Sequence, residues 1–254
     1  MDNNNIKFTN YRVENAQATG SAVMPNTYIA KVFLWMFIAL GVSTLFAFLF
    51  ANNPALMSYL VHYNAVTGKG GLSLLGMVVM FAPIGFVLLM SFAFQRLSAT
   101  TLIALFMAYA AINGISFSFI LLTYTSGSII ACFASAAAMF GIMAVMGYTT
   151  QKDLTSFGRI LTMGLIGIVV AMLINIFLKS NTMGYIISIL GVAIFTGLTA
   201  WDVQKLKNIG SGVAYGEISE QDGKKLGVLG ALTLYLDFIN IFLFLLRLFG
   251  SKRD

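Results

Sequence analysis

The chain has 254 residues, of which 59% are hydrophobic and 9% are charged, whereas about a quarter of an ordinary soluble domain is charged. This composition excludes a soluble globular domain and indicates a polytopic membrane protein. The positive excess of six charges is scattered through short polar segments, so nucleic acid is not an expected partner.

The apolar residues form continuous runs. A membrane β-barrel would instead need alternating segments of about ten residues, so helices are favoured. At about 20 residues per span, the chain accommodates seven transmembrane helices. The sequence therefore predicts an all-α membrane protein with one transmembrane domain over residues 28–250. A polar amino-terminal tail (1–27) precedes it and a short tail (251–254) follows it.

The tail 1–27 lacks the apolar core of a signal peptide and is expected to be mobile. The turn Gln95-Arg96-Leu97 is so tight that the helices on either side must be antiparallel neighbours. The polar stretch 208–225, rich in Gly, Ser and charged residues, predicts a solvated, flexible connection. The seven spans are expected at 28–51, 72–94, 98–122, 128–148, 157–178, 184–207 and 226–249.

Basic residues predict the orientation, because Lys and Arg are enriched in cytoplasmic connections. With the amino terminus inside, ten basic residues fall on the inner side and five on the outer side. The sequence therefore predicts a cytoplasmic amino terminus and, with an odd number of spans, an external carboxy terminus. The inner residues are Lys7, Arg12, Lys31, Arg96, Lys152, Arg159, Lys205, Lys207, Lys224 and Lys225, and the outer ones are Lys69, Lys179, Arg247, Lys252 and Arg253.

Two of the nine acidic residues, Asp202 and Asp237, fall inside apolar runs. A carboxylate at membrane depth is costly unless it is paired, hydrated or neutralised, so each is a functional candidate. If the two meet, repulsion and desolvation should make them share one proton, which would create a pH sensor. The alternative for Asp202 is a helix-end residue that reaches headgroups or water, since its apolar run ends one to two turns later.

Other polar residues lie near these acids in the sequence. Asn240 follows Asp237 by about one helical turn, so a polar stripe should face a cavity or a partner helix. Thr196 and Thr199 form the corresponding stripe before Asp202, and hydrogen bonding to neighbouring helices is their expected role.

Enzyme functions find little support. The single histidine, His62, lies in a predicted connection, whereas membrane zinc hydrolases need several histidines at depth. No glycine directly precedes Asp202 or Asp237, as an intramembrane aspartyl protease motif would require. Cys132 is alone, so the chain can form no internal disulfide, and a packed hydrophobic role is expected for it. The sequence predicts neither catalysis nor a cofactor.

Three motifs together resemble the Bax inhibitor-1 family, also called the transmembrane Bax inhibitor motif proteins. They are Thr199-Ala-Trp-Asp202-Val-Gln204-Lys-Leu, Leu234-Tyr-Leu-Asp237-Phe-Ile-Asn240 leading to Leu246-Arg-Leu-Phe-Gly250, and Asn113-Gly114-Ile-Ser. The resemblance covers residues 29–250. It implies two three-helix layers around a central carboxy-terminal helix, and a calcium leak whose conductance responds to pH.

The resemblance also assigns roles to individual residues. Asp202 and Asp237 would sense pH, line the ion pathway and bind calcium transiently, with Thr199, Asn240 and Asn113 as supporting polar residues. Arg96 matches the family's arginine latch to the acidic pair, although an arginine that snorkels toward the interface is the alternative. Some members carry another acidic residue where this chain has Gly85, so a third carboxylate is not expected.

Two functional hypotheses follow. The first is a pH-sensitive calcium leak channel, gated by the aspartate pair and the arginine latch. The second is a membrane interaction protein that regulates a stress response or a membrane protease, in which the aspartates only hold the bundle together. Both need the same inward polar residues, so sequence alone does not separate them. A bacterial inner membrane is the expected location, with calcium, the lipid bilayer and a membrane protein as candidate partners.

Overall fold

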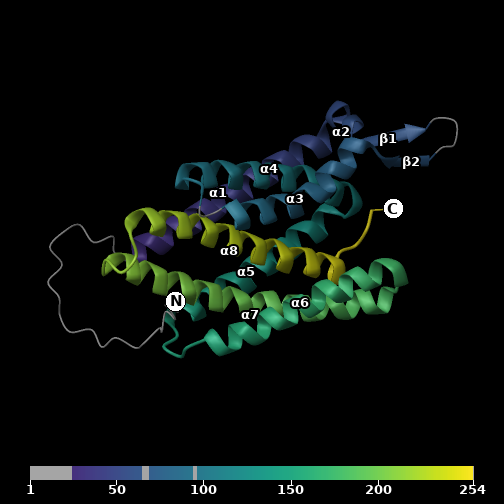
Figure 1. Ribbon diagram of the computed structural model, residues 1–254. Helices are drawn as coiled ribbons and strands as arrows, with labels where there is room; N and C mark the ends of the chain where they lie inside the picture. Colours follow the sequence, from purple (N-terminus) through teal and green to yellow (C-terminus); the bar gives the residue numbers. More distant parts are fainter. Residues whose placement is uncertain (1–24, 65–68, 94–95, 254) are drawn as a thin grey trace, which may run out of the picture.

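The computed structural model describes residues 25–64, 69–93 and 96–253, and this part of the chain is almost entirely helical. Figure 1 shows the long helices running side by side, with a small hairpin projecting at one end. The elements are α1 (Pro25–Asn52), α2 (Pro54–Leu60), β1 (Val61–Asn64), β2 (Lys69–Leu72), α3 (Leu74–Ala93), α4 (Ala99–Thr123), α5 (Ser126–Thr149), α6 (Thr155–Leu178), α7 (Asn181–Ala214) and α8 (Glu220–Phe249).

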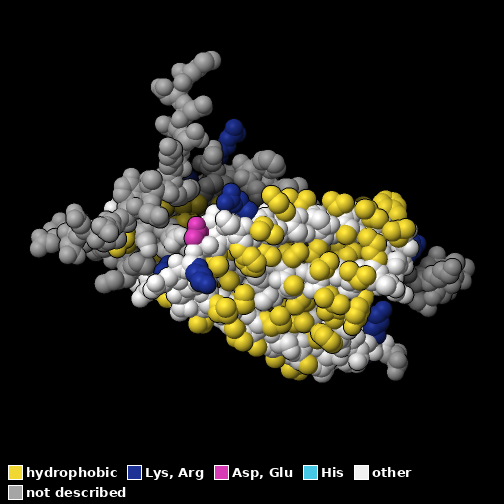
Figure 2. Space-filling view, turned by 90° about the horizontal axis from the view of Figure 1, so that it is seen from below, with side chains coloured by type: hydrophobic (Ala, Val, Ile, Leu, Met, Phe, Trp, Pro, Cys, Tyr) yellow, Lys and Arg dark blue, Asp and Glu magenta, His cyan; other side chains and the backbone are white. Residues whose placement is uncertain are grey.

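Within the described residues, six helices are long and apolar enough to cross a membrane, namely α1, α4, α5, α6, α7 and α8. Figure 2 shows one face of the molecule covered with hydrophobic side chains, with the Lys and Arg side chains near its two ends. This distribution is that of an integral membrane protein, as predicted. The predicted second span corresponds to α3, a 20-residue helix with Pro83 inside it. The crossing of α3, and with it the count of seven, stays a prediction.

Helix α8 is the most enclosed of the six long helices. In its most apolar 18-residue window, 72% of the residues are buried, against 6% for α6. It packs against α1, α4, α5 and α7. The carboxy-terminal helix is therefore surrounded by other helices, whereas the grouping of those helices into two layers of three stays a prediction.

Two glycines set how closely neighbouring helices approach. A Cβ at Gly114 of α4 would collide with the backbone of Ser43 in α1, and one at Gly147 of α5 would collide with the backbone of Ala200 in α7. Small residues permit such contacts in membranes, where apolar burial gives little drive for association. These contacts fix α4 on α1 and α7 on α5.

The predicted flexible connection at 208–225 is wrong. Helix α7 continues to Ala214 and α8 begins at Glu220, so five residues separate them. At 1.5 Å per residue α7 is roughly 51 Å long, well over the ~30 Å hydrocarbon core. Polar residues are tolerated where a helix extends into water, so polarity marked the membrane boundary and not the end of the helix. Gly216, with φ of 77°, reverses the chain, and Ser219 caps α8 by accepting from the Asp222 N–H at 3.1 Å.

The chain ends also differ in part from expectation. Helix α1 begins at Pro25, inside the predicted tail, and the rest of that tail (1–24) lies outside the described residues. The carboxy-terminal segment pairs with the turn between α4 and α5: the Arg253 N–H donates to the Thr123 carbonyl at 2.8 Å. The stretch between α1 and α3 contains the short helix α2 and the antiparallel hairpin β1–β2.

Candidate functional site

Asp202 of α7 and Asp237 of α8 meet inside the helix bundle. Both are buried, with 8% and 3% of their surfaces exposed, and their carboxyl groups lie within hydrogen-bonding reach of each other. The Asp237 Oδ2 atom is buried and has no hydrogen-bond partner among the described residues. The structure therefore juxtaposes two carboxyl groups whose contact the sequence only permitted.

Asp202 lies farther from the end of its helix than its sequence position suggested. Because α7 continues to Ala214, about 12 residues, or roughly 18 Å, separate Asp202 from the end of the helix. The expectation of one to two turns is corrected to more than three. The burial of the side chain, of which 8% is exposed, argues against the alternative in which Asp202 reaches headgroups from a helix end.

The cation that acts on Asp202 is the exposed Lys205, which follows it by three residues on α7. Its Nζ atom stands 5.5 Å from the centre of the Trp201 ring. Arg96, the predicted latch, is exposed in the α3–α4 connection, and the described structure shows no ion pair between it and either aspartate. Lys205 therefore acts electrostatically on Asp202, and in the described residues neither Lys205 nor Arg96 forms an ion pair with an aspartate.

The polar stripes beside the aspartates bond differently from the expectation. The Thr199 hydroxyl donates to the Phe195 carbonyl at 2.8 Å, and the Asn240 amide donates to the Leu236 carbonyl at 2.7 Å. Both bonds stay within one helix, so the predicted hydrogen bond from Thr199 to a neighbouring helix is wrong. Backbone carbonyls one turn back are the nearest acceptors for short polar side chains on a helix.

Asn113 belongs to a second polar cluster. It is buried on α4 beside the hydroxyls of Tyr109 and Tyr235. The Ser43 hydroxyl of α1 lies 2.8 Å from the Tyr235 hydroxyl and 2.7 Å from the Ala110 carbonyl. Sequence reasoning missed Ser43, Tyr109 and Tyr235. The available signal was Tyr235, a hydroxyl two residues before Asp237 in an apolar run.

Gln204, two residues after Asp202, fixes the connection between α5 and α6. Its amide donates to the Lys152 carbonyl at 2.8 Å, and its Oε1 accepts from the Leu154 N–H at 2.8 Å. In the same connection, hydrogen bonds from Thr155 hold the pKa of Asp153 below its ordinary value. Asp153 is a fully exposed, ionised carboxylate, in contrast to the buried pair. Sequence reasoning gave Gln204 no role, although an amide so close to Asp202 was a signal.

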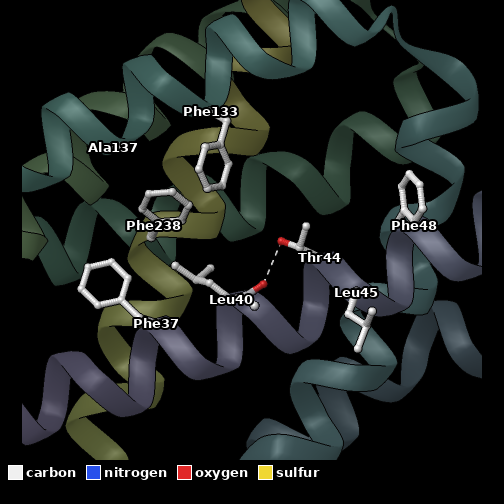
Figure 3. Close-up of a pocket in the computed structure, with 9 residues that line it drawn as sticks. Phe37, Leu40, Thr44, Leu45, Phe48, Phe133, Ala137 and Phe238 are labelled. Atoms are coloured by element: carbon white, nitrogen blue, oxygen red, sulfur yellow. Dashed lines mark hydrogen bonds between the residues drawn. The ribbon is translucent and has the colours of Figure 1, made fainter.

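A groove of about 620 Å³ lies between α1 and α5, and Phe238 of α8 forms part of its wall (Figure 3). Its lining is apolar, and its one hydroxyl, that of Thr44, donates to the Leu40 carbonyl at 2.9 Å. Such a surface suits lipid chains and offers nothing to a cation. The groove is therefore not part of the candidate ion site.

Sequence comparisons place this arrangement among known proteins. The inner membrane protein YbhL of Escherichia coli is 44% identical over 227 residues, which are 89% of this chain and 92% of that protein. A protein of Borreliella burgdorferi is 38% identical over 242 residues, 95% of this chain and 99% of the relative. A membrane protein of Streptococcus pyogenes is 34% identical over 236 residues, 92% of this chain and 96% of the relative.

The family described as "Inhibitor of apoptosis-promoting Bax1" matches residues 25–254. The match extends over all the transmembrane helices, including both helices that carry the aspartate pair. This chain is therefore an integral membrane protein of the Bax inhibitor-1 family.

Proposed function

We propose that this protein is a pH-sensitive calcium leak channel in which Asp202 and Asp237 control conduction. The observation that carries the proposal is the contact of two buried carboxyl groups from α7 and α8. Intramembrane acidic residues of this kind usually mark ion or proton pathways. The family resemblance of the surrounding motifs supports the same function.

The chemistry of the pair suits a hard divalent cation. Calcium takes six to eight oxygen ligands, including carboxylates and water. The described residues contain no group of three or more acidic, His or Cys side chains placed to hold a metal. Two carboxylates supply at most about four oxygens, so water would complete the shell. Such a site binds weakly, and weak binding favours passage over retention.

A proton would control the pair because two adjacent, buried carboxylates repel each other when both are ionised. In the proposed resting state the pair carries negative charge and a nearby cation holds the helices together. Acid would neutralise the pair, release that cation and raise conductance. Arg96 is our proposed latch, brought onto the pair in the closed state, and Lys205 is the cation that already lies close to Asp202.

The similarity to the inner membrane protein YbhL supports a bacterial inner membrane location, and the basic-residue count supports a cytoplasmic amino terminus. In that orientation the α7–α8 turn and the α3–α4 connection face the cytoplasm. The proposed sensor would then respond to cytoplasmic pH.

The test is calcium flux into liposomes that contain only the purified protein, measured with an entrapped indicator between pH 5 and 8. We expect flux that rises as the pH falls. Protein-free liposomes give the background at each pH. Flux equal to background at every pH would contradict the proposal and favour the alternative, a membrane interaction protein without transport activity.

A further inference from the structure

A cavity of about 300 Å³ lies at the end of the bundle where α7 stops and α8 starts. Its walls come from the first turns of α1, α4 and α8 and from the end of α7. It is distinct from the apolar groove, because it contains charged side chains. The lining residues that matter below are Tyr28, Lys31, Trp35, Ile103, Glu220 and Lys224.

The cavity lies at the edge of the membrane. Helices α7 and α8 exceed the length needed to cross the hydrocarbon, so the end of α7 and the start of α8 reach into the interface. Trp35 lies more than two turns inside α1, on the apolar side of the cavity. Tryptophan is enriched at this depth of a membrane. The cavity thus has one wall in the interface and one against the hydrocarbon.

The interfacial wall carries a net positive charge. Lys31 of α1 and Lys224 of α8 both line the cavity, together with the single carboxylate of Glu220. In the described part of the chain none of these three side chains takes part in an ion pair. Two ammonium groups from different helices therefore line one cavity, and their N–H donors are available to an anionic group.

The inner wall is apolar and held in place. Its apolar surface is formed by the side chains of Val32, Trp35, Ile103 and Val228. The Tyr28 hydroxyl, which could otherwise offer a polar group, donates to the Gly223 carbonyl at 3.1 Å. This bond joins α1 to α8 across the cavity wall and keeps the two lysine-bearing helices in register.

We propose that this cavity binds the headgroup of an anionic phospholipid, with the phosphate at Lys31 and Lys224 and the first acyl carbons against Trp35. Basic pockets between helices at a membrane face are suited to such headgroups. A free phosphate would use the lysines but leave the apolar wall without a partner. The lipid would bridge α1 and α8 at the same end of the bundle as the proposed latch.

The test uses Trp35 as a reporter in the full-length protein with Trp201→Phe, which leaves one tryptophan. The protein is reconstituted in phosphatidylcholine vesicles containing increasing fractions of phosphatidylglycerol with brominated acyl chains. Bromine quenches a tryptophan that it contacts. We expect half-maximal quenching at a clearly lower mole fraction of brominated phosphatidylglycerol than of brominated phosphatidylcholine.

Variants that remove one positive charge show which lysines cause the preference for phosphatidylglycerol. Lys31→Gln and Lys224→Gln should each weaken the preference for phosphatidylglycerol by roughly fivefold, the effect of about 1 kcal/mol per lysine near a membrane surface. Lys31→Arg should retain it. Lys225→Gln is the matched control, because this neighbour of Lys224 carries the same charge but does not line the cavity.

Three results would overturn the assignment. Equal quenching by both lipids would show no headgroup selection. If Lys224→Gln and Lys225→Gln weaken the preference for phosphatidylglycerol equally, the preference comes from general surface charge and not from a specific site. Reversal of the quenching by millimolar inorganic phosphate would identify a free phosphate site instead of a lipid site.

Discussion

Two carboxyl groups in contact inside a helix bundle cost stability, through desolvation and through mutual repulsion. Nearby side chains do little to offset that cost here. Thr199 and Asn240 bond their own helices, and Asp237 Oδ2 has no partner among the described residues. A pair left in this condition is better explained by a function than by structural support.

Replacing either aspartate should remove the pH response. Asp202→Asn or Asp237→Asn leaves a single carboxyl group without the repulsion that couples protonation to the pair. We expect calcium flux in liposomes to become nearly independent of pH between 5 and 8. Asp153→Asn is the matched control, because it removes the same charge from an exposed position. A single mutant that still titrates like the wild type would exclude the pair from gating.

Arg96 and Lys205 are competing candidates for the cation that keeps the channel closed. If Arg96 is the latch, Arg96→Ala should leak more at neutral pH and respond less to acid. Arg96→Lys should be intermediate, because it keeps the charge but loses the planar guanidinium. Open and closed states commonly differ by a few kcal/mol, so loss of one ion pair is enough to shift them.

Lys205→Gln is the comparison, since Lys205 is the cation near Asp202 in this structure. Flux should be measured across pH at matched protein density in the liposomes. An unchanged profile in Arg96→Ala together with a raised leak in Lys205→Gln would transfer the role to Lys205. The snorkelling alternative for Arg96 is supported if Arg96→Ala inserts normally and conducts like the wild type.

Gln204 connects the aspartate-bearing helix α7 to the segment between α5 and α6. Its two hydrogen bonds satisfy one backbone donor and one backbone acceptor in a connection that has few other long-range bonds. Lys207 adds a third link, donating to the Tyr148 carbonyl at 2.8 Å. The position of Asp202 therefore depends on contacts beyond the membrane core.

Gln204→Ala should lower the free energy of unfolding by about 1–3 kcal/mol, because two partly buried backbone groups lose their partners. The measurement is thermal unfolding of the purified protein in detergent, read as a fall in melting temperature. Asn208→Ala is the control, since that amide is exposed on the next turn of α7. Equal melting temperatures for Gln204→Ala and the wild type would contradict the bracing role.

We predict that α3 crosses the membrane together with the six longer helices of the described chain. Large hydrophobic side chains on α1, α5 and α6 are exposed, as expected of helices that face lipid, and α8 is the most buried helix. Helix α3 contacts α4 and has Pro83 within it. A proline kink is tolerated in a membrane helix where neighbours satisfy the freed carbonyl.

Cysteine labelling should settle the crossing of α3. In a Cys132→Ala background, one cysteine is placed at His62, before α3, and in a second protein at Thr101, after it; both positions are exposed. An impermeant maleimide applied to intact cells should label His62→Cys, and Thr101→Cys only after the membrane is opened. Labelling of both from the same side would exclude seven spans.

Reporter fusions check the orientation as a separate point. With seven crossings and the predicted inside amino terminus, a reporter after Asp254 should be external and one at Gly216, in the α7–α8 turn, cytoplasmic. The reverse result would show that the basic-residue count was misleading. The proposed sensor would then face the outside.

Composition and motifs were enough to predict the membrane class, the approximate helices and the two acids that lie inside apolar runs. Charged residues are so costly in hydrocarbon that each apolar run is visible as a span, and any acid within a run stands out. The span predicted at 157–178 matches α6 closely, and the family could be recognised from its motifs. These are local properties, recorded in consecutive residues.

Which residues meet depends on how the helices pack against one another. The contact of Asp202 with Asp237 and the cluster of Ser43 with Tyr235 depend on the rotation and tilt of packed helices, which composition does not encode. The length of α7 was misjudged for a related reason. A helix keeps its backbone hydrogen bonds when it leaves the bilayer. Hydropathy therefore marks the membrane boundary, whereas the end of the helix depends on packing.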